Sequence, residues 1–148
     1  MAGYNTDGAG ALAALRHAGL GDLLGARVLV LGAGPTARAT IAALLAAGTV
    51  VSIWNRSRAK ADAIVRTGDV RLWRATDAPD AVFSSLPPGA IPGNTTLLTT
   101  IAAAPLVIDA NYGPRATLGA LLGRDVADGA AMLAASARAS FAFFRSVL

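Results

Sequence analysis

The chain has 148 residues, of which 54% are hydrophobic and 15% charged, a composition that excludes a disordered segment. It has no cysteine, one histidine and no glutamate, so disulfide bonds and thiolate metal sites are excluded and we expect no bound metal. The formal net charge of +4 comes from arginines spread along the sequence and a single lysine, Lys60. Because these cations are scattered, we expect no nucleic-acid partner.

No targeting or membrane segment is evident in the sequence. The N-terminus lacks a basic stretch followed by an apolar core. The apolar, charge-free stretch over residues 39–55 is interrupted by Gly48, Thr49 and Ser52, and a membrane span needs about 20 apolar residues. We therefore expect a cytoplasmic location and no membrane partner.

The first half of the chain predicts a helix, a strand and a second helix. Residues 8–20 carry leucines at near-helical spacing, with Asp7 as a candidate N-cap. The apolar run over residues 27–31 predicts a buried parallel strand. Residues 35–47 are rich in Ala and Leu, and they predict a helix with Pro35 in its first turn and Gly48 after its end.

The second half continues the alternation of strands and helices. We expect strands over residues 50–54, 70–73, 81–85 and 106–109, a short helix over residues 57–67 and a long one over residues 128–147. This order is typical of an α/β protein with a parallel sheet. The sequence predicts a three-layer Rossmann fold of about six strands, with helices on both faces, in a single domain over residues 1–148.

A glycine-rich turn follows the first predicted strand and opens the next helix. It has the pattern G-x-G-x-x-A and consists of Gly32, Ala33, Gly34, Pro35, Thr36 and Ala37. In this context the first glycine permits the tight turn, and the second lets a pyrophosphate approach the backbone at the helix N-terminus. The turn favours a dinucleotide site; the alternative is a turn that serves packing alone.

The end of the second strand indicates which dinucleotide is bound. NAD-binding domains place an acidic residue there to contact the ribose 2′-hydroxyl. This chain has no acid between Ile53 and Ala61, and it has instead Asn55, Arg56, Ser57, Arg58 and Lys60. Arginine binds a 2′-phosphate with paired donors, so we expect NADP(H). The alternative is a solvated basic patch at a helix start, where cations oppose the helix dipole.

Further motifs give a family resemblance that spans nearly the whole chain. Residues 3–10 read GYNTDGAG, residues 55–57 NRS, residues 109–114 DANYGP and residues 128–133 DGAAML. Together with the glycine turn, these segments resemble the C-terminal, NADP-binding domain of the shikimate dehydrogenase family. The resemblance implies hydride transfer between NADP(H) and the shikimate/3-dehydroshikimate pair, a step of the shikimate pathway to aromatic amino acids.

The resemblance also assigns roles to individual residues. It implies that Asp7 is the catalytic acid–base, whereas the residues alone favour a helix cap. It places Asn5, Tyr112 and Ser136 at the substrate. To the cofactor residues of the glycine turn and of segment 55–60 it adds Ser84, Ser85, Leu86, Ala110, Gly129 and Met132.

The chain departs from the family pattern in its substrate half. The family's catalytic lysine belongs to an N-terminal substrate domain that we do not find here, and Lys60 is already placed at the phosphate. The loop over residues 84–89 keeps only part of the family motif, and Ser136 stands where a glutamine is usual. We expect segments 1–21 and 128–148 to form the junction with a separate substrate domain or a homodimer. A free-standing NADP(H)-binding module, and a quinate or amino-shikimate dehydrogenase, stay open as alternatives.

Overall fold

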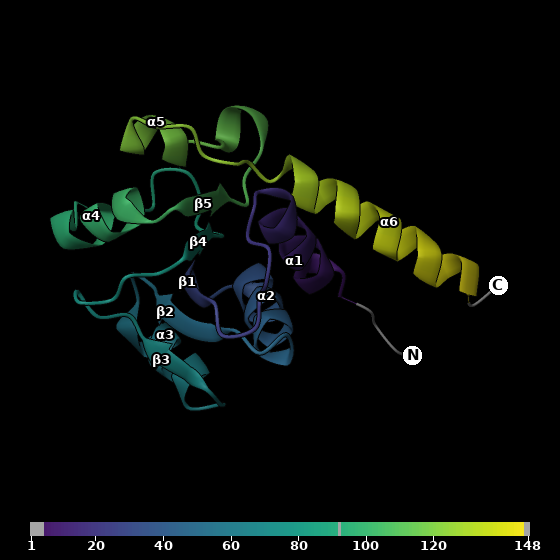
Figure 1. Cartoon of the computed structure of the whole chain (residues 1–148), viewed down its shortest axis with the longest axis horizontal. Coiled ribbons are helices and arrows are strands. Elements are labelled where there is room, and N and C mark those ends of the chain that lie inside the picture. Colours follow the sequence, from purple (N-terminus) through teal and green to yellow (C-terminus); the bar gives the residue numbers. More distant parts are fainter. Residues whose placement is uncertain (1–4, 92, 147–148) are drawn as a thin grey trace.

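The computed structural model describes residues 5–91 and 93–146 (Figure 1). Gly3 and Tyr4 of the first motif, and the last two residues of the chain, lie outside the described residues. In chain order the elements are α1 (Asp7–His17), β1 (Arg27–Leu31), α2 (Pro35–Ala46), β2 (Val50–Trp54), α3 (Arg58–Val65), β3 (Val70–Leu72), β4 (Ala81–Ser84), α4 (Thr95–Ala103), β5 (Leu106–Asp109), a 3-10 turn (Gly113–Arg115), α5 (Leu118–Leu122) and α6 (Ala130–Ser146).

The described strands form one parallel sheet in the order β3-β2-β1-β4-β5. The register aligns Leu31 at the end of β1 with Trp54 of β2 and Ser84 of β4. The chain therefore reverses direction across the sheet between β1 and β4, the place where ligands bind in open α/β folds. Where about six strands were expected there are five, and a single parallel bridge from Ile108 to Ala127 lies beyond β5. The chain turns into α6 soon after Ala127, so this bridge extends no further.

Two hydrophobic cores lie on opposite faces of the sheet and give the three layers (Figure 1). Val28 and Val30 of β1 face α1, α2 and α3, whereas Leu29 and Leu31 face α4 and α5. All four are at most 1% exposed, which confirms a strand buried on both faces. The expected Rossmann architecture is thus the one observed.

Helix α1 is packed tightly between α2 and α6 (Figure 1). A Cβ on Gly8 would lie 2.7 Å from the carbonyl oxygen of Ala39 in α2. A Cβ on Gly10 would lie 2.8 Å from the carbonyl oxygen of Met132 in α6 and would collide with Ser136 Oγ. Both glycines therefore allow the close packing of α1 against α2 and α6.

The start of α1 corrects the expectation that Asp7 is its N-cap. The N-cap is Thr6, whose side chain makes no capping hydrogen bond, and Asp7 is the first residue of the helix. The backbone N–H of Asp7 donates to Asn5 Oδ1 at 2.9 Å, so Asn5 supplies the local side-chain acceptor. The Asp7 carboxylate accepts a hydrogen bond from another helix, which the sequence pattern does not encode.

Other element boundaries differ by a few residues. The helix expected over residues 57–67 runs over Arg58–Val65, and the strand expected over residues 70–73 over Val70–Leu72. Helices α4 and α5 were not expected at all. Helix α4 begins after Asn94, whose side chain accepts from the N–H of Leu97 at 3.0 Å.

Candidate functional site

The glycine turn between β1 and α2 contains two glycines, and only the first is required by the backbone conformation and packing of the protein. Gly32 has φ of +116°, and a Cβ there would lie 2.7 Å from Ser85 Oγ, so the fold itself demands glycine. Gly34 has an ordinary extended backbone, with φ −77° and ψ −176°, and nothing lies within 4 Å of its Cβ position. The protein's own packing thus leaves the space in front of Gly34 open.

The N-terminus of α2 has backbone donors that no side chain satisfies. Gly34 is its N-cap and provides no side-chain acceptor, and the first turn contains no acidic residue. The first N–H groups of a helix lack intrahelical partners and carry the positive end of its dipole. This terminus is therefore suited to an anion such as a pyrophosphate.

A second part of the site, which we call the arginine pocket, lies at the ends of β2 and β3. It is a cavity of about 330 Å³ lined by Ile53, Trp54, Asn55, Arg56, Arg58, Ala61, Leu72 and Trp73. Arg58 is committed to Asp62, with 2.9 Å between its Nε and Oδ1. Within the described residues Arg56 and Lys60 are exposed and have no hydrogen-bond or ion-pair partner. These two cations are available to a ligand.

Most of the remaining predicted residues meet in another cavity, which we call the Asp7 cavity. It has a volume of about 250 Å³ and is lined by Asp7, Thr36, Ser85, Ala110, Asn111, Tyr112, Gly129, Met132, Leu133 and Ser136. Asn5 is not in this lining; it is exposed and holds the N–H of Asp7. Helices α1, α2 and α6 and the loops after β4 and β5 all contribute, so the cavity depends on their relative packing.

Hydroxyl groups in the Asp7 cavity are already engaged with the protein. Thr36 Oγ1 donates to Asp7 Oδ2 at 2.9 Å. Ser136 Oγ donates to the carbonyl oxygen of Thr6 at 3.2 Å, which ties α6 to the start of α1. Ser85 Oγ donates to the carbonyl oxygen of Leu31 at 3.2 Å. The Tyr112 side chain, by contrast, is 52% exposed.

Asn111 is a residue of the site that the sequence analysis missed. Its Nδ2 donates to Asp109 Oδ1 at 2.7 Å and to the carbonyl oxygen of Leu86 at 2.8 Å, and its own carbonyl oxygen accepts from the N–H of Gly129. It thereby joins the loops after β4 and β5 to the start of α6. The predicted Ser84 and Leu86 lie on its other side, in a cavity of about 370 Å³. The only signal was its place within the DANYGP segment.

The tryptophans of the arginine pocket were also missed. Trp54 comes directly before Asn55, and Trp73 follows β3. The indole Nε1 of Trp73 is buried and has no hydrogen-bond partner in the described part of the chain. Trp54 could have been predicted, because it lies next to the basic segment in the sequence. Trp73 could not, because it is brought to the pocket by the pairing of β3 with β2.

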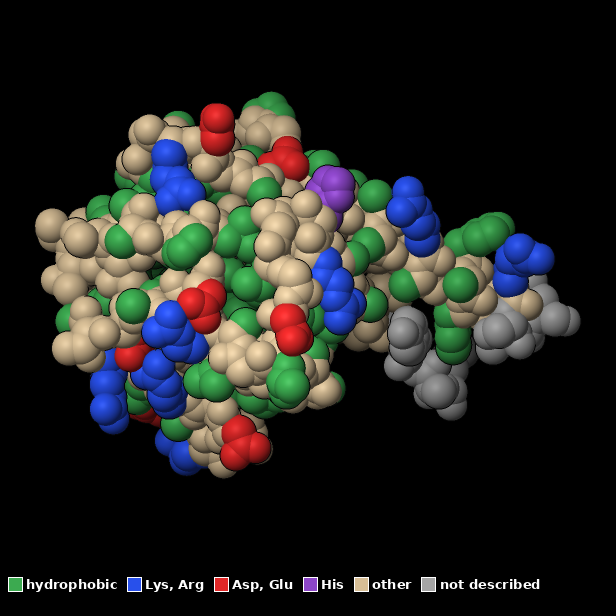
Figure 2. Space-filling view, viewed as in Figure 1, with side chains coloured by type: hydrophobic (Ala, Val, Ile, Leu, Met, Phe, Trp, Pro, Cys, Tyr) green, Lys and Arg blue, Asp and Glu red, His purple; other side chains and the backbone are tan. Residues whose placement is uncertain are grey.

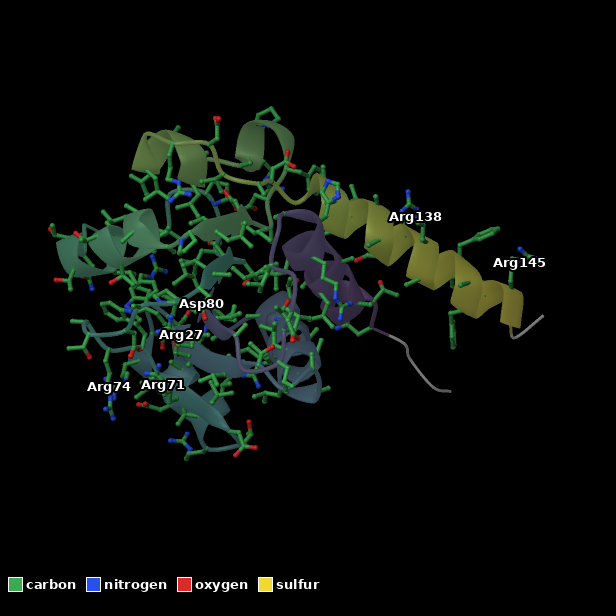
Figure 3. All side chains as sticks on the ribbon, in the orientation of Figure 1. Arg27, Arg71, Arg74, Asp80, Arg138 and Arg145 are labelled. Atoms are coloured by element: carbon green, nitrogen blue, oxygen red, sulfur yellow. The ribbon has the colours of Figure 1, made fainter. Side chains whose placement is uncertain are left out.

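On the face shown in Figure 2, several Lys and Arg side chains gather at the lower left, with acidic side chains among them. Figure 3 shows Arg27 beside Asp80, Arg71 and Arg74 near β3, and Arg138 and Arg145 on α6. The guanidinium of Arg27 donates to Asp80 at 2.7 Å and holds the pKa of that carboxyl below its usual range. Among the described residues, no cluster of His and Asp could hold a metal, and no helix has both the length and the apolar character to cross a membrane.

Helix α6 exposes apolar side chains along its length. Leu133 is 50% exposed, Phe141 65% and Phe144 62%, while Met132 on the opposite side is buried against α1. Figure 1 shows the second half of α6 extending beyond α1. The helix therefore presents an uncovered face next to the Asp7 cavity.

Comparison with known proteins agrees with the motifs. The family model for shikimate / quinate 5-dehydrogenase matches residues 13–85. A shikimate dehydrogenase (NADP(+)) of Shewanella halifaxensis is 35% identical to this chain over an alignment of 160 residues. The alignment covers 98% of this chain and 57% of that protein. One from Acidiphilium cryptum is 43% identical over 109 residues, which cover 72% of this chain and 37% of that protein.

The solved structures give the same result. Shikimate 5-dehydrogenase from Thermus thermophilus, in complex with NADP(H) and shikimate, aligns with a TM-score of 0.77 at 29% identity. The alignment covers 99% of this chain and 58% of that one, so the chain spans a little over half the length of these relatives. On the sequence motifs, the sheet order and these matches together, the chain belongs to the shikimate dehydrogenase family.

Proposed function

We propose that the chain is the NADP(H)-binding domain of a shikimate dehydrogenase-like oxidoreductase. The observation that carries the proposal is Gly34: neither its backbone conformation nor its packing requires glycine, yet it stands at the open N-terminus of α2. A glycine with no structural reason is explained by a ligand that must approach the backbone. Relatives named as NADP(+)-dependent supply the identity of that ligand.

The described residues fit the three parts of NADP(H). The pyrophosphate belongs at Gly34 and the free N–H groups of α2. The 2′-phosphate belongs at Arg56, which lines the arginine pocket, and at Lys60, which lies on α3 outside the pocket lining. The nicotinamide end belongs in the Asp7 cavity, where Met132, Ala110 and Gly129 offer apolar and backbone contacts. Ser85 lines the same cavity, whereas the predicted Ser84 and Leu86 line the neighbouring cavity of about 370 Å³.

NADP(H), when bound, supplies the hydride acceptor or donor for the shikimate/3-dehydroshikimate pair. Asp7 then takes the proton from the reacting hydroxyl of shikimate, or returns it in the reverse direction. Asp7 is half-buried and lines the same cavity as Tyr112 and Ser136, which we assign to substrate binding together with Asn5. Lys60 is the single lysine of the sequence and lies on α3, so a lysine partner for Asp7 comes from outside these 148 residues.

A substrate domain, joined to this chain or separate from it, is the second part of the proposal. It would cover the exposed face of α6 formed by Leu133, Phe141 and Phe144 and close the Asp7 cavity. Relatives that match over only 57% of their length have room for such a domain. A second copy of the chain on the same face is the alternative occupant.

Calorimetric titration of the isolated chain with NADPH and with NADH tests the binding proposal. We expect NADPH to bind more tightly, since a charge-assisted hydrogen bond contributes about 1.5–3 kcal/mol. Arg56→Asp should weaken NADPH about 10- to 100-fold and leave NADH nearly unchanged. Arg66→Asp, the same charge change at the far end of α3, is the control. Equal affinities for the two dinucleotides in the wild-type chain would contradict the phosphate assignment.

An assay of shikimate oxidation tests the enzymatic part. We expect turnover when a substrate domain from the family is added and none with the chain alone. NADPH binding that never leads to turnover, with any added domain, would favour the free-standing binding module.

A further inference from the structure

The hydrogen bond between Thr36 and Asp7 joins the glycine turn to the proposed acid–base residue. The two residues are 29 positions apart in sequence, and Thr36 Oγ1 lies 2.9 Å from Asp7 Oδ2. Thr36 is in the first turn of α2, two residues after Gly34. Both side chains are half-buried and line the Asp7 cavity.

The backbone around Asp7 is fixed on three sides. Gly8 allows α1 to lie against Ala39 of α2, and Gly10 allows it to lie against α6. Asn5 Oδ1 accepts from the N–H of Asp7 at 2.9 Å. What remains free is rotation of the Asp7 side chain, and within the described residues Thr36 is the only side chain that donates to its carboxylate.

We propose that Thr36 is a positioning residue that holds one carboxylate oxygen of Asp7 and leaves the other for the reacting groups. This proposal rests on the proposed function. Because Thr36 is part of the turn that receives the pyrophosphate, the orientation of Asp7 is coupled to the segment that binds the dinucleotide. A carboxylate kept in one orientation needs no rearrangement when the substrate hydroxyl arrives.

The two oxidation states of the dinucleotide provide a test that needs no turnover. The nicotinamide ring of NADP⁺ carries a positive charge and that of NADPH is neutral. The Asp7 carboxylate, held in the same cavity as the ring, favours the oxidised form. Because solvent partly screens the attraction between the carboxylate and the ring, we expect NADP⁺ to bind about threefold to tenfold more tightly than NADPH. A carboxylate released from Thr36 moves toward water and contributes less to this preference.

The experiment measures the dissociation constants of NADP⁺ and NADPH by calorimetry for the wild type and four variants. Asp7→Asn should reduce the NADP⁺ preference by the full threefold to tenfold. Thr36→Val, which keeps the shape and removes the hydroxyl, should shift the ratio in the same direction, and Thr36→Ser should restore it. Asp7→Asn combined with Thr36→Val should equal Asp7→Asn alone. A purely structural role for Thr36 would weaken both dinucleotides equally and leave the ratio unchanged.

The outcomes separate this inference from the proposed function. If the wild type binds neither dinucleotide, the proposed function fails, and this inference with it. If both bind, Asp7→Asn shifts the ratio and Thr36→Val leaves it at the wild-type value, only the inference is overturned. If Asp7→Asn also leaves the ratio unchanged, the placement of the nicotinamide in the Asp7 cavity fails together with the inference. Thermal unfolding shows whether Thr36→Val is folded; should it unfold, Thr36→Ala replaces it with the same expected shift.

Discussion

The two halves of the candidate site are built in different ways. The glycine turn and the basic residues of the arginine pocket come from one continuous stretch, β1 through the start of α3, and each lies directly after the strand that positions it. The Asp7 cavity is assembled from α1, α2, α6 and two loops that are far apart in sequence. The first half therefore depends on the sheet and on the first turns of α2 and α3, whereas the second depends on how α1, α2 and α6 pack together. Substitutions that disturb the packing of these helices should therefore affect the Asp7 cavity more than the glycine turn and the arginine pocket.

The largest expected effect is in the glycine turn, where Gly34 and Gly32 can be compared directly. Gly34→Ala should leave thermal stability unchanged and weaken NADPH about 100-fold or more, because the methyl group displaces a pyrophosphate held by charge-assisted hydrogen bonds.

Gly32→Ala is the matched variant, in which φ of +116° and the contact with Ser85 make alanine strained. It should lower stability by about 1–3 kcal/mol. NADPH affinity of Gly34→Ala at the wild-type level would remove the main support for the cofactor site.

A smaller effect is expected where α1 crosses α2. Gly8→Ala places a Cβ 2.7 Å from the carbonyl oxygen of Ala39, and overpacking of this kind costs about 1–3 kcal/mol. Urea unfolding measures the loss of stability. The preference for NADPH over NADH should persist in this variant, because the arginine pocket does not include α1.

Gly68→Ala is the control for the Gly8 variant, since nothing lies within 4 Å of its Cβ position. A loss of that preference in Gly8→Ala would show that the two halves of the site are coupled through the packing of α1.

The smallest effect is expected at the amino ends of β1 and β4, outside both halves. Arg27 lowers the pKa of Asp80 in the folded chain, so this contact contributes stability above the unfolded-state pKa of about 3.9 and loses it as the pH falls through the lower, folded-state value. Asp80→Asn should lower stability slightly at pH 7 and flatten its fall below about pH 4. Denaturant unfolding at several pH values measures this. Asp69→Asn serves as the control, and an identical acid profile for wild type and Asp80→Asn would contradict the assignment.

The parts of the fold that could be predicted are those with local causes. Strand β1 was recognised from a run of apolar residues, and the glycine turn from its place between that strand and a helix. Helix α4 was missed because its threonines favour strands, although Asn94 was a usable capping signal. Helix α5 has five residues, too few for a periodic pattern.

The parts of the site that escaped prediction have long-range causes. The residues next to Asp7 indicate a helix cap, because its hydrogen-bond partner Thr36 is 29 residues away in sequence. Asn111 acquires its place by bonding Leu86 and Gly129 from two other loops, which nothing near it in sequence indicates. The family resemblance implies the role proposed for Asp7, and the packing of α1 gives a physical reason for its position.

The placement of the tryptophans has a practical consequence. The sequence contains two, Trp54 and Trp73, and both line the arginine pocket. All of the indole emission of the molecule therefore arises at the edge of the sheet where β2 and β3 end. A ligand that reaches this edge changes the whole signal, while events on α6 leave it untouched. The chain thus carries an unlabelled optical reporter for one half of its site, suited to rapid-mixing measurements of how the dinucleotide arrives.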